Sequence, residues 1–252
     1  MTDNPIAYVN FPDRAALLDD LTTRMVARTG FTVATINLDH IVKMRSDPAF
    51  EAAYGRHSHI VADGNPIVWL AKLAGRKVDL IPGSELIAPL VAIAADKGVP
   101  IALLGSTEAT LDLTARRLQD QHPTLKIVAK IAPAFGFDPQ GDAAAAALRE
   151  IDQSGAGLCF LALGAPKQEM LAIRGADLAP GCGFVSIGAG LDFIAGHQTR
   201  APVWVRKLAL EWFWRMMTNP KRLAKRYALC AAVLPGLALA SWRKPQSAQP
   251  DT

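Results

Sequence analysis

Residues 158–169 read LCFLALGAPKQE. Six apolar residues are followed by a Gly-Ala-Pro turn and then by Lys167, Gln168 and Glu169, which start an amphipathic stretch that ends near residue 178. A short apolar run that ends in a turn and opens into a helical pattern is typical of one strand–helix unit of an α/β protein. The turn also places a cation and two hydrogen-bonding side chains at the end of the most apolar predicted strand, although a Lys-Gln-Glu start is ordinary for a surface helix.

The same pattern recurs on both sides of this unit. We predict strands at 32–38, 59–62, 101–104, 127–131, 158–163 and 183–187, and helical stretches at 39–54, 84–98, 107–122, 142–154 and 168–178. Strands that alternate with helices predict a doubly wound, mostly parallel, Rossmann-like α/β sheet. In such a sheet the loops at the carboxyl ends of the strands converge, and ligands bind in the crevice between them.

The charge changes sign near residue 197. Residues 197–252 hold ten Lys and Arg but only two acidic residues, which leaves 17 basic and 21 acidic residues in 1–196. The basic residues alternate with aromatic and Met side chains and precede an apolar run at 228–242. This composition favours an element that lies on an anionic membrane surface. A solvated basic helix packed on its own domain is the alternative, and an acidic body without a nucleic-acid-binding signature argues against nucleic acid.

These features predict three regions: an α/β catalytic domain at 1–196, a basic amphipathic helical appendage at 197–244 and a disordered tail at 245–252. The apolar run has 15 residues and contains Pro235 and Gly236, so it is shorter than the roughly 20 residues that cross a bilayer. Three widely spaced cysteines and no secretory pattern near Met1 predict a reducing compartment. We therefore expect a cytoplasmic protein on the inner face of the plasma membrane.

A phosphate site is predicted after the strand at 101–104. Gly105 and Ser106 follow this strand and precede a helix, whose free backbone N–H groups and dipole favour an anion such as a diphosphate. Helix capping by Ser106 or Thr107 explains the same residues equally well.

The segment GAGLDF at 188–193 begins like a dinucleotide fingerprint. Phe193 stands where the third glycine belongs, and the motif follows the last predicted strand instead of the first, which disfavours a dehydrogenase. Gly188 and its neighbours instead permit a close approach of backbone to a ligand or helix, with Asp192 beside them.

Asp63 follows the apolar run at 60–62 and precedes Gly-Asn-Pro at the predicted crevice. A carboxylate in this place has the position that a general base needs to accept a proton from an attacking hydroxyl. Capping of a helix that starts at Pro66 is the competing interpretation.

The sequence offers no metal pattern. There is no Asp-x-Asp, and His57 and His59 have no partner at metal-ligand spacing. We therefore expect no metal and no cofactor, and phosphate binding by backbone amides and basic side chains. The candidate cations in the tail are Arg200, Arg215, Arg222 and Arg226. Pro220 interrupts a single helix through them, so we predict a helix, a turn and a second helix that starts at Pro220 with Asn219 as its cap.

With these motifs in hand, the chain resembles the WecG/TagA/CpsF glycosyltransferases, glycosyltransferase family 26, over roughly residues 30–228. The matching segments in order are TIN (35–37), ADGNPIVW (62–69), GSEL (83–86), LGS (104–106), GAPKQE (164–169), GAGLDFIAG (188–196), RAP (200–202), LEWFWR (210–215), NPKR (219–222) and RY (226–227). The family commonly has Gly-Thr/Ser-Asp-Leu where this chain has Glu85 as the third residue.

The resemblance implies an inverting enzyme that moves a sugar from a UDP-sugar to a polyprenyl-diphosphate-linked acceptor at the cytoplasmic membrane face. N-acetylmannosamine-type sugars, glucose and glucuronic acid are donors among relatives. It further implies that Asp63 is the base, that Thr35 and Asn37 line the same pocket, and that the appendage closes over the site.

Two other classes stay open on the residues alone. A nucleotide-binding oxidoreductase or epimerase would carry a nicotinamide cofactor, and a membrane-surface adaptor would bind anionic lipid without catalysis. The apolar surface around the tail also leaves homo-oligomerisation open.

Overall fold

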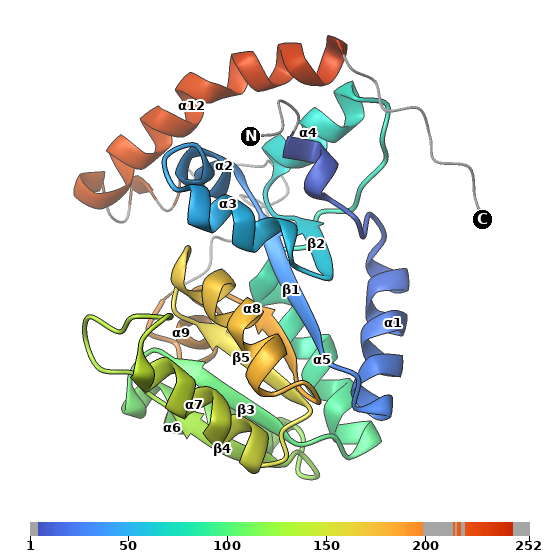
Figure 1. The fold of residues 1–252 in the computed structure, drawn as a ribbon, viewed down its shortest axis with the longest axis vertical. Coiled ribbons are helices and arrows are strands. Elements are labelled where there is room, and N and C mark those ends of the chain that lie inside the picture. Colours follow the sequence, from blue (N-terminus) through green and yellow to red (C-terminus); the bar gives the residue numbers. More distant parts are fainter. Residues whose placement is uncertain (1–4, 199–213, 215, 218–219, 244–252) are drawn as a thin grey trace.

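The computed structural model describes residues 5–198, 214, 216–217 and 220–243 of the 252-residue chain. Its centre is a sheet of six parallel strands in the order β2-β1-β6-β5-β3-β4, with helices on both faces (Figure 1). The strands are β1 (Phe31–Ile36), β2 (His59–Ala62), β3 (Ile101–Gly105), β4 (Ile127–Ile131), β5 (Leu158–Ala162) and β6 (Gly183–Ser186). The predicted parallel Rossmann-like fold is therefore confirmed.

The helices begin with the 3-10 helix η1 (Pro5–Tyr8). The α-helices are α1 (Arg14–Ala27), α2 (Leu38–Met44), α3 (Pro48–Gly55), α4 (Asn65–Leu73), α5 (Gly83–Lys97), α6 (Glu108–Gln121), α7 (Asp142–Gln153), α8 (Lys167–Leu178), α9 (Gly190–Ile194) and α12 (Pro220–Arg243). The predicted helical stretch at 39–54 is divided into α2 and α3. The division falls at Asp47, because its side chain accepts a hydrogen bond from the Phe50 amide at 3.0 Å and caps a new helix that has Pro48 in its first turn.

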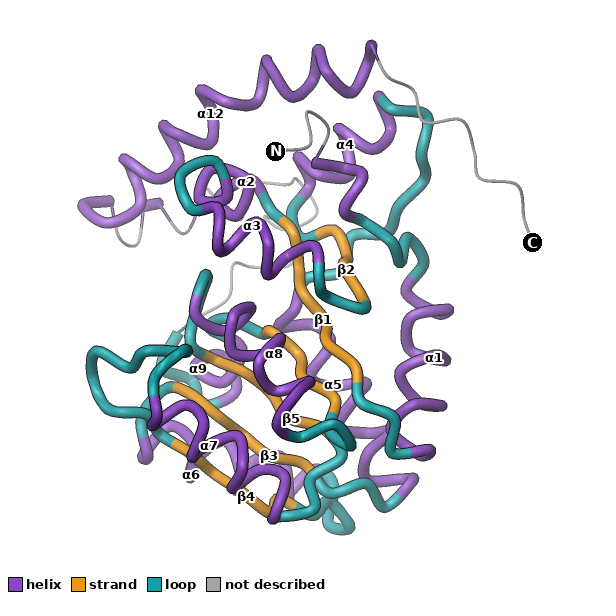
Figure 2. Tube along the Cα trace, in the orientation of Figure 1, coloured by secondary structure: helices purple, strands orange, loops and turns teal. Residues whose placement is uncertain are grey.

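Two layers of helices cover the sheet, and the strands supply alternate side chains to each (Figure 2). Leu103, Phe160 and Val185 belong to a core shared with α1, α5 and α6. Leu104 and Leu161 lie in the opposite core, which α7 and α8 complete. Because both faces are covered, every residue of the inner strand β1 and of the edge strand β2 is buried, as expected for parallel strands between two layers of helices.

The sheet has a switch point between the neighbouring strands β3 and β5. Helix α6, which follows β3, packs into one core, whereas α8, which follows β5, packs into the other. Ligands of open α/β sheets bind outside the carboxyl ends of the strands at such a point. The turns at 105–107 and 164–166 are therefore in the place where a ligand site is expected.

Helix α12 crosses over α2 and α4 near the carboxyl ends of β1 and β2 (Figure 1). Its start at Pro220 confirms the predicted second tail helix, whereas Asn219, the predicted cap, lies outside the described residues. Leu223, Cys230 and Leu237 form its buried face. The helix continues through Pro235 and has 24 residues, so it extends well beyond the 15-residue apolar run of the sequence. Within the described chain, its segment Leu223–Arg243 is long and apolar enough to cross a membrane by length and composition, and its most apolar window has a mean hydropathy of 1.4.

Candidate functional site

Two of the predicted catalytic residues lie together where β1 and β2 end. Asn37 is the N-cap of α2, and its side-chain oxygen accepts a hydrogen bond from the His40 amide at 3.0 Å. The other end of the same side chain donates from Nδ2 to Oδ2 of Asp63 at 3.4 Å. Asp63 is also held through its backbone, since its N–H donates to the Ile36 carbonyl at 2.8 Å. Helix α4 has Gly64 as its N-cap, so Asp63 lies one residue before the cap position.

Thr35, the third of these residues, lies deeper in the same edge of the sheet. It is buried, and its backbone carbonyl accepts a hydrogen bond of 2.7 Å from the Tyr54 hydroxyl. Its methyl group lies against the start of α5, where a Cβ on Gly83 would be 3.2 Å from Thr35 Cγ2 and would also meet the Ser186 carbonyl oxygen. Glycine at position 83 therefore allows the N-terminus of α5 to approach the ends of β1 and β6.

An ion-pair chain joins the tail helix to this edge. Arg226 of α12 contacts Asp39 Oδ1 at 2.8 Å, and Lys43 contacts Asp39 Oδ2 at 2.9 Å. The Lys43 ammonium also donates to the carbonyl of Ala165 at 2.9 Å, in the turn between β5 and α8. Asp39 and Lys43 are not among the site residues predicted from the sequence. Their i,i+4 spacing in a predicted helix indicates an ion pair, which is the signal that could have found them.

The predicted phosphate loop after β3 has an unusual backbone. Gly105 has φ of 121°, and a Cβ at this position would collide with the backbone of Ala162 on the neighbouring strand. Ser106 is also left-handed, with φ of 54°, and its hydroxyl donates to Asp192 Oδ1 at 2.9 Å. The cap of α6 is Thr107, so capping accounts for Thr107 but not for Ser106. The Ser106–Asp192 bond therefore connects the loops that follow β3 and β6.

Gln168 connects two further loops of the edge. Its Oε1 accepts hydrogen bonds from the backbone amides of Gly164, at 3.2 Å, and Gly188, at 3.1 Å. Its Nε2 donates to Glu169 Oε1 at 2.8 Å. Gln168 is 3% exposed, and its two amide contacts fix the turns after β5 and β6 relative to each other. Lys167, the residue before it, is half-buried.

A cluster of buried titratable groups lies beneath these loops, between α3, α8 and β1. Burial raises the pKa of Glu169 to about 7, and one of its oxygens has no hydrogen-bond partner. Burial lowers the pKa of His40 and that of His57 to about 3 each, so both rings are neutral. The pKa of Tyr54 is raised by burial and by the carboxylates of Glu169 and Asp63. Desolvated groups of this kind are frequent near functional sites.

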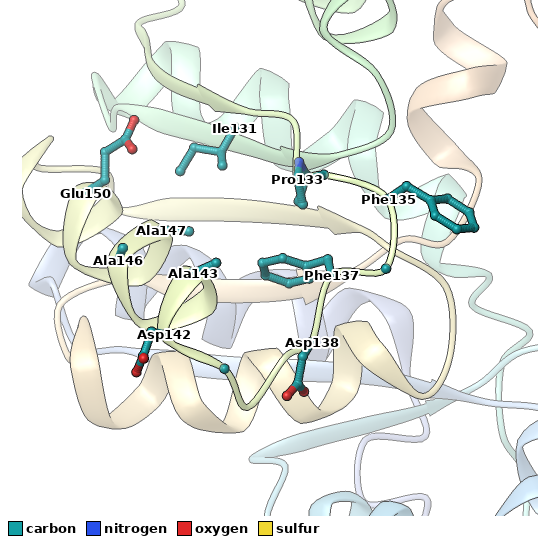
Figure 3. Close-up of a pocket in the computed structure, with 13 residues that line it drawn as sticks. Ile131, Pro133, Phe135, Phe137, Asp138, Asp142, Ala143, Ala146, Ala147 and Glu150 are labelled. Atoms are coloured by element: carbon teal, nitrogen blue, oxygen red, sulfur yellow. The ribbon is translucent and has the colours of Figure 1, made fainter.

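A separate pocket of about 540 Å³ lies beside β4, between this strand and α7 (Figure 3). Phe137 lies along the helix next to Ala143, whereas Phe135 points away from it. The lining includes Asp138, Asp142 and Glu150 but none of the predicted site residues. Three carboxylates make this pocket a poor place for a diphosphate.

The structure also locates the other predicted groups. Arg226 reaches the site edge through Asp39, whereas Arg200, Arg215 and the side chain of Arg222 lie outside the described residues. Glu85, the departure from the family pattern, pairs with Arg14 at 3.1 Å. Within the described ranges, no group of three or more His, Cys, Asp or Glu is arranged to hold a metal ion.

The fold and the site define a Rossmann-like α/β protein whose polar residues gather at the carboxyl edge of the sheet. The comparison with known families agrees with the resemblance inferred from the motifs. Residues 6–248 match the glycosyl transferase WecG/TagA/CpsF family. The match covers nearly the whole chain, and the protein therefore belongs to this family and is a glycosyltransferase.

Proposed function

We propose that the protein is an inverting, metal-independent transferase that moves a sugar from a UDP-sugar to a polyprenyl-diphosphate-linked acceptor. The pathway would be bacterial exopolysaccharide or cell-envelope polysaccharide synthesis. The observation that carries the proposal is the Asn37–Asp63 contact. It holds a carboxylate at the carboxyl edge of the sheet, where α/β proteins bind their ligands, in a chain that belongs to a glycosyltransferase family.

The donor diphosphate lies, in this proposal, at the switch point between β3 and β5. The loops at Gly105, Ser106 and Gly188 and the Lys167 side chain supply its contacts, while Gln168 and Asp192 hold the loops in position. Buried side chains that fix loop amides before a ligand arrives reduce the reorganisation that binding requires.

Asp63 is the proposed general base. It takes the proton of an acceptor sugar hydroxyl, whose oxygen then attacks the anomeric carbon of the donor. The bond from that carbon to the UDP oxygen breaks, and UDP departs with the electron pair. Attack on the face opposite UDP inverts the configuration. Asn37 would orient the carboxylate, and Thr35, near the end of β1, is proposed to line the same pocket.

Negative charge grows on the departing UDP, and the tail arginines are proposed to stabilise it. Arg226 supports this role because its guanidinium is already at the site edge, 2.8 Å from Asp39. Arg200, Arg215 and Arg222 are the other candidates. Preorganised cations are most effective where water is excluded, which is the environment that an appendage over the crevice would create.

The membrane is the proposed location of the acceptor. Only 17% of the most apolar window of α12 is buried, which leaves an apolar surface on the outer side of a helix that begins with Lys221, Arg222, Lys225 and Arg226. Because the opposite face of α12 packs on α2 and α4, we propose that the helix lies along the inner leaflet surface instead of crossing it.

The proposal is tested by UDP release from a panel of UDP-sugars, in EDTA, with and without a synthetic polyprenyl-diphosphate-linked sugar acceptor. We expect one donor to give turnover that requires the acceptor and survives EDTA. Turnover that EDTA abolishes and Mg²⁺ restores would refute metal independence. Equal turnover without acceptor would identify a UDP-sugar hydrolase, and no turnover with any donor would refute the proposed substrates.

A further inference from the structure

Exposed apolar side chains gather in one part of the molecule. Ten large hydrophobic residues of the described chain are exposed, and seven of them lie on α4, between α4 and α5, on α12 or just before α12. These seven are Trp69, Leu73, Leu80, Met217, Leu229, Leu239 and Trp242. The other three, Val26, Val128 and Phe135, are on α1, on β4 and in the loop after β4. The exposed apolar surface is therefore not confined to the tail.

Helix α4 has two contrasting faces. Ile67, Leu70 and Ala71 are buried in the core, whereas Trp69 is 51% exposed and Leu73, one turn later, is 48% exposed. Residues 65–78 contain three cations, Lys72, Arg76 and Lys77, and no acidic residue. Trp69 and Leu73 beside Lys72 on a surface helix, with two further cations directly after the helix, match the chemistry of an anionic membrane interface.

The position of α4 beside the tail helix supports the same partner. Val68 of α4 packs in one cluster with Leu237 and Leu234 of α12, so the two helices are neighbours in a common core. Lys72 and Lys77 also line a groove of about 380 Å³ that includes Val68. Arg76 is fixed in that groove because its guanidinium donates to the carbonyls of Ile6 and Val9, both at 2.7 Å.

We propose that α4 is a second membrane-binding element, which places Trp69 and Leu73 in the headgroup region of an anionic phospholipid bilayer while Lys72 and Lys77 contact lipid phosphates. The proposal rests on the membrane association proposed above and extends it from the tail to the catalytic body. Continuity with α12 and the absence of acidic residues from 65–78 favour a bilayer over a protein partner.

The contact has a consequence for catalysis. Helix α4 begins two residues after Asp63, and Trp69 follows four residues later. At 1.5 Å per helical residue, a membrane-bound Trp69 lies within about 10 Å, along the helix, of the segment that carries the proposed base. Anchoring α4 would therefore hold the carboxyl edge of the sheet at the depth of a lipid-linked diphosphate.

The direct test labels single positions of the full-length chain with an environment-sensitive fluorophore. Leu73→Cys reports on α4, Leu239→Cys on α12 and Phe135→Cys on an apolar site elsewhere. The three native cysteines are buried, and labelled wild type gives the background. With vesicles of three parts phosphatidylcholine to one part phosphatidylglycerol, we expect a blue shift and quenching by spin-labelled lipid at positions 73 and 239 and neither at 135.

Each other outcome overturns the inference in a distinguishable way. A shift at 239 without one at 73 would leave tail association intact and refute the role of α4. No shift at either position would refute both membrane proposals. A shift at 73 without vesicles that grows with protein concentration would assign the face to a second copy of the chain.

Substitution gives an independent measure of the contact. Trp69→Ser with Leu73→Ser should weaken vesicle binding about tenfold, because both removed side chains are half-exposed apolar groups. The matched control, Phe135→Ser with Val26→Ser, removes an aromatic and an aliphatic side chain that are both more exposed than those of α4 and should change binding less than about twofold. Equal effects of the two pairs would contradict a specific role for α4.

Discussion

Among individual residues, Glu169 is a buried carboxyl that helps to position the loops of the candidate site through its hydrogen bond with Gln168. It is fully buried, and its pKa of about 7 means that the folded protein keeps a proton on a carboxyl that the unfolded chain loses near pH 4.5. Only one of its oxygens is hydrogen-bonded, to Gln168, which in turn holds the Gly164 and Gly188 amides. A desolvated carboxyl that readily holds a proton therefore helps to position Gln168 and, through it, the loops at Gly164 and Gly188 that are proposed to bind the donor.

Replacement of Glu169 by Gln tests this protonation state. Between pH 4.5 and about 7 the folded protein binds more protons at residue 169 than the unfolded chain, so its free energy of unfolding falls as the pH rises. Glu169→Gln removes this dependence, and we expect its stability relative to wild type to increase by up to about 3 kcal/mol from pH 4 to pH 8.

Urea denaturation of both proteins across this range measures the difference. His40 and His57, whose lowered pKa values reduce stability as the pH falls below 6.5, are present in both proteins and cancel. A constant difference between the two proteins at all pH values would contradict a buried, protonated Glu169.

The contacts between the predicted site residues differ in how much of them the sequence pattern could predict. Asp63 follows one predicted strand and Asn37 is near the end of another, and because parallel neighbours end at the same edge, their proximity follows once these two strands are adjacent. The Ser106–Asp192 bond and the two-loop contact of Gln168 depend on which strands are neighbours in the sheet, an arrangement that the sequence pattern leaves undetermined.

Helix α12 is the element whose attachment matters most to the proposal. Its contact with the body rests on Leu223, Cys230 and Leu237, together with the Arg226–Asp39 ion pair. The sequence predicted a helix from Pro220 but not the partner on which it packs, because burial of a helix face depends on tertiary neighbours. The ion pair is partly exposed, so it contributes little to stability and mainly fixes the orientation of Arg226.

The attachment of α12 is tested by a pair of leucines two residues apart. Leu237 is 3% exposed and Leu239 is 44% exposed. Leu237→Ala should cost about 2–4 kcal/mol in the docking of α12, because it removes a buried side chain. Leu239→Ala should change it by less than about 0.5 kcal/mol. Hydrogen exchange along α12 is the measurement, since only a loosened helix loses protection there. Equal protection in the two variants would contradict the observed packing.

The charges of the whole molecule are divided between an acidic body and a basic tail. Residues 1–196 carry 17 basic and 21 acidic side chains, whereas residues 197–252 carry ten basic and two acidic ones. The molecule is thus electrostatically polar, and the segment 65–78 of the acidic body resembles the tail in having three cations and no acidic residue. Helices α4 and α12 contact each other, so these two regions of the chain are neighbours in space.

Salt and lipid charge test this polarity. Each Lys or Arg near an anionic surface contributes about 1 kcal/mol at low ionic strength, and the attraction is screened within a Debye length. We expect the full chain to bind vesicles that contain phosphatidylglycerol at least about tenfold more tightly than pure phosphatidylcholine at low salt, with most of the difference lost at 1 M salt. Vesicle sedimentation measures both effects. Equal affinity for the two vesicle types would contradict electrostatic attraction.

The central claim is that Asp63 takes the acceptor proton. The most direct measurement compares wild type with Asp63→Asn, which preserves the size of the side chain, for turnover and for UDP binding by calorimetry. We predict that turnover falls by about 10²–10⁴-fold, which is the usual effect of removing a general base, while the Kd for UDP changes less than about threefold. Turnover within a few-fold of wild type, or UDP affinity that falls in parallel with it, would contradict the assignment.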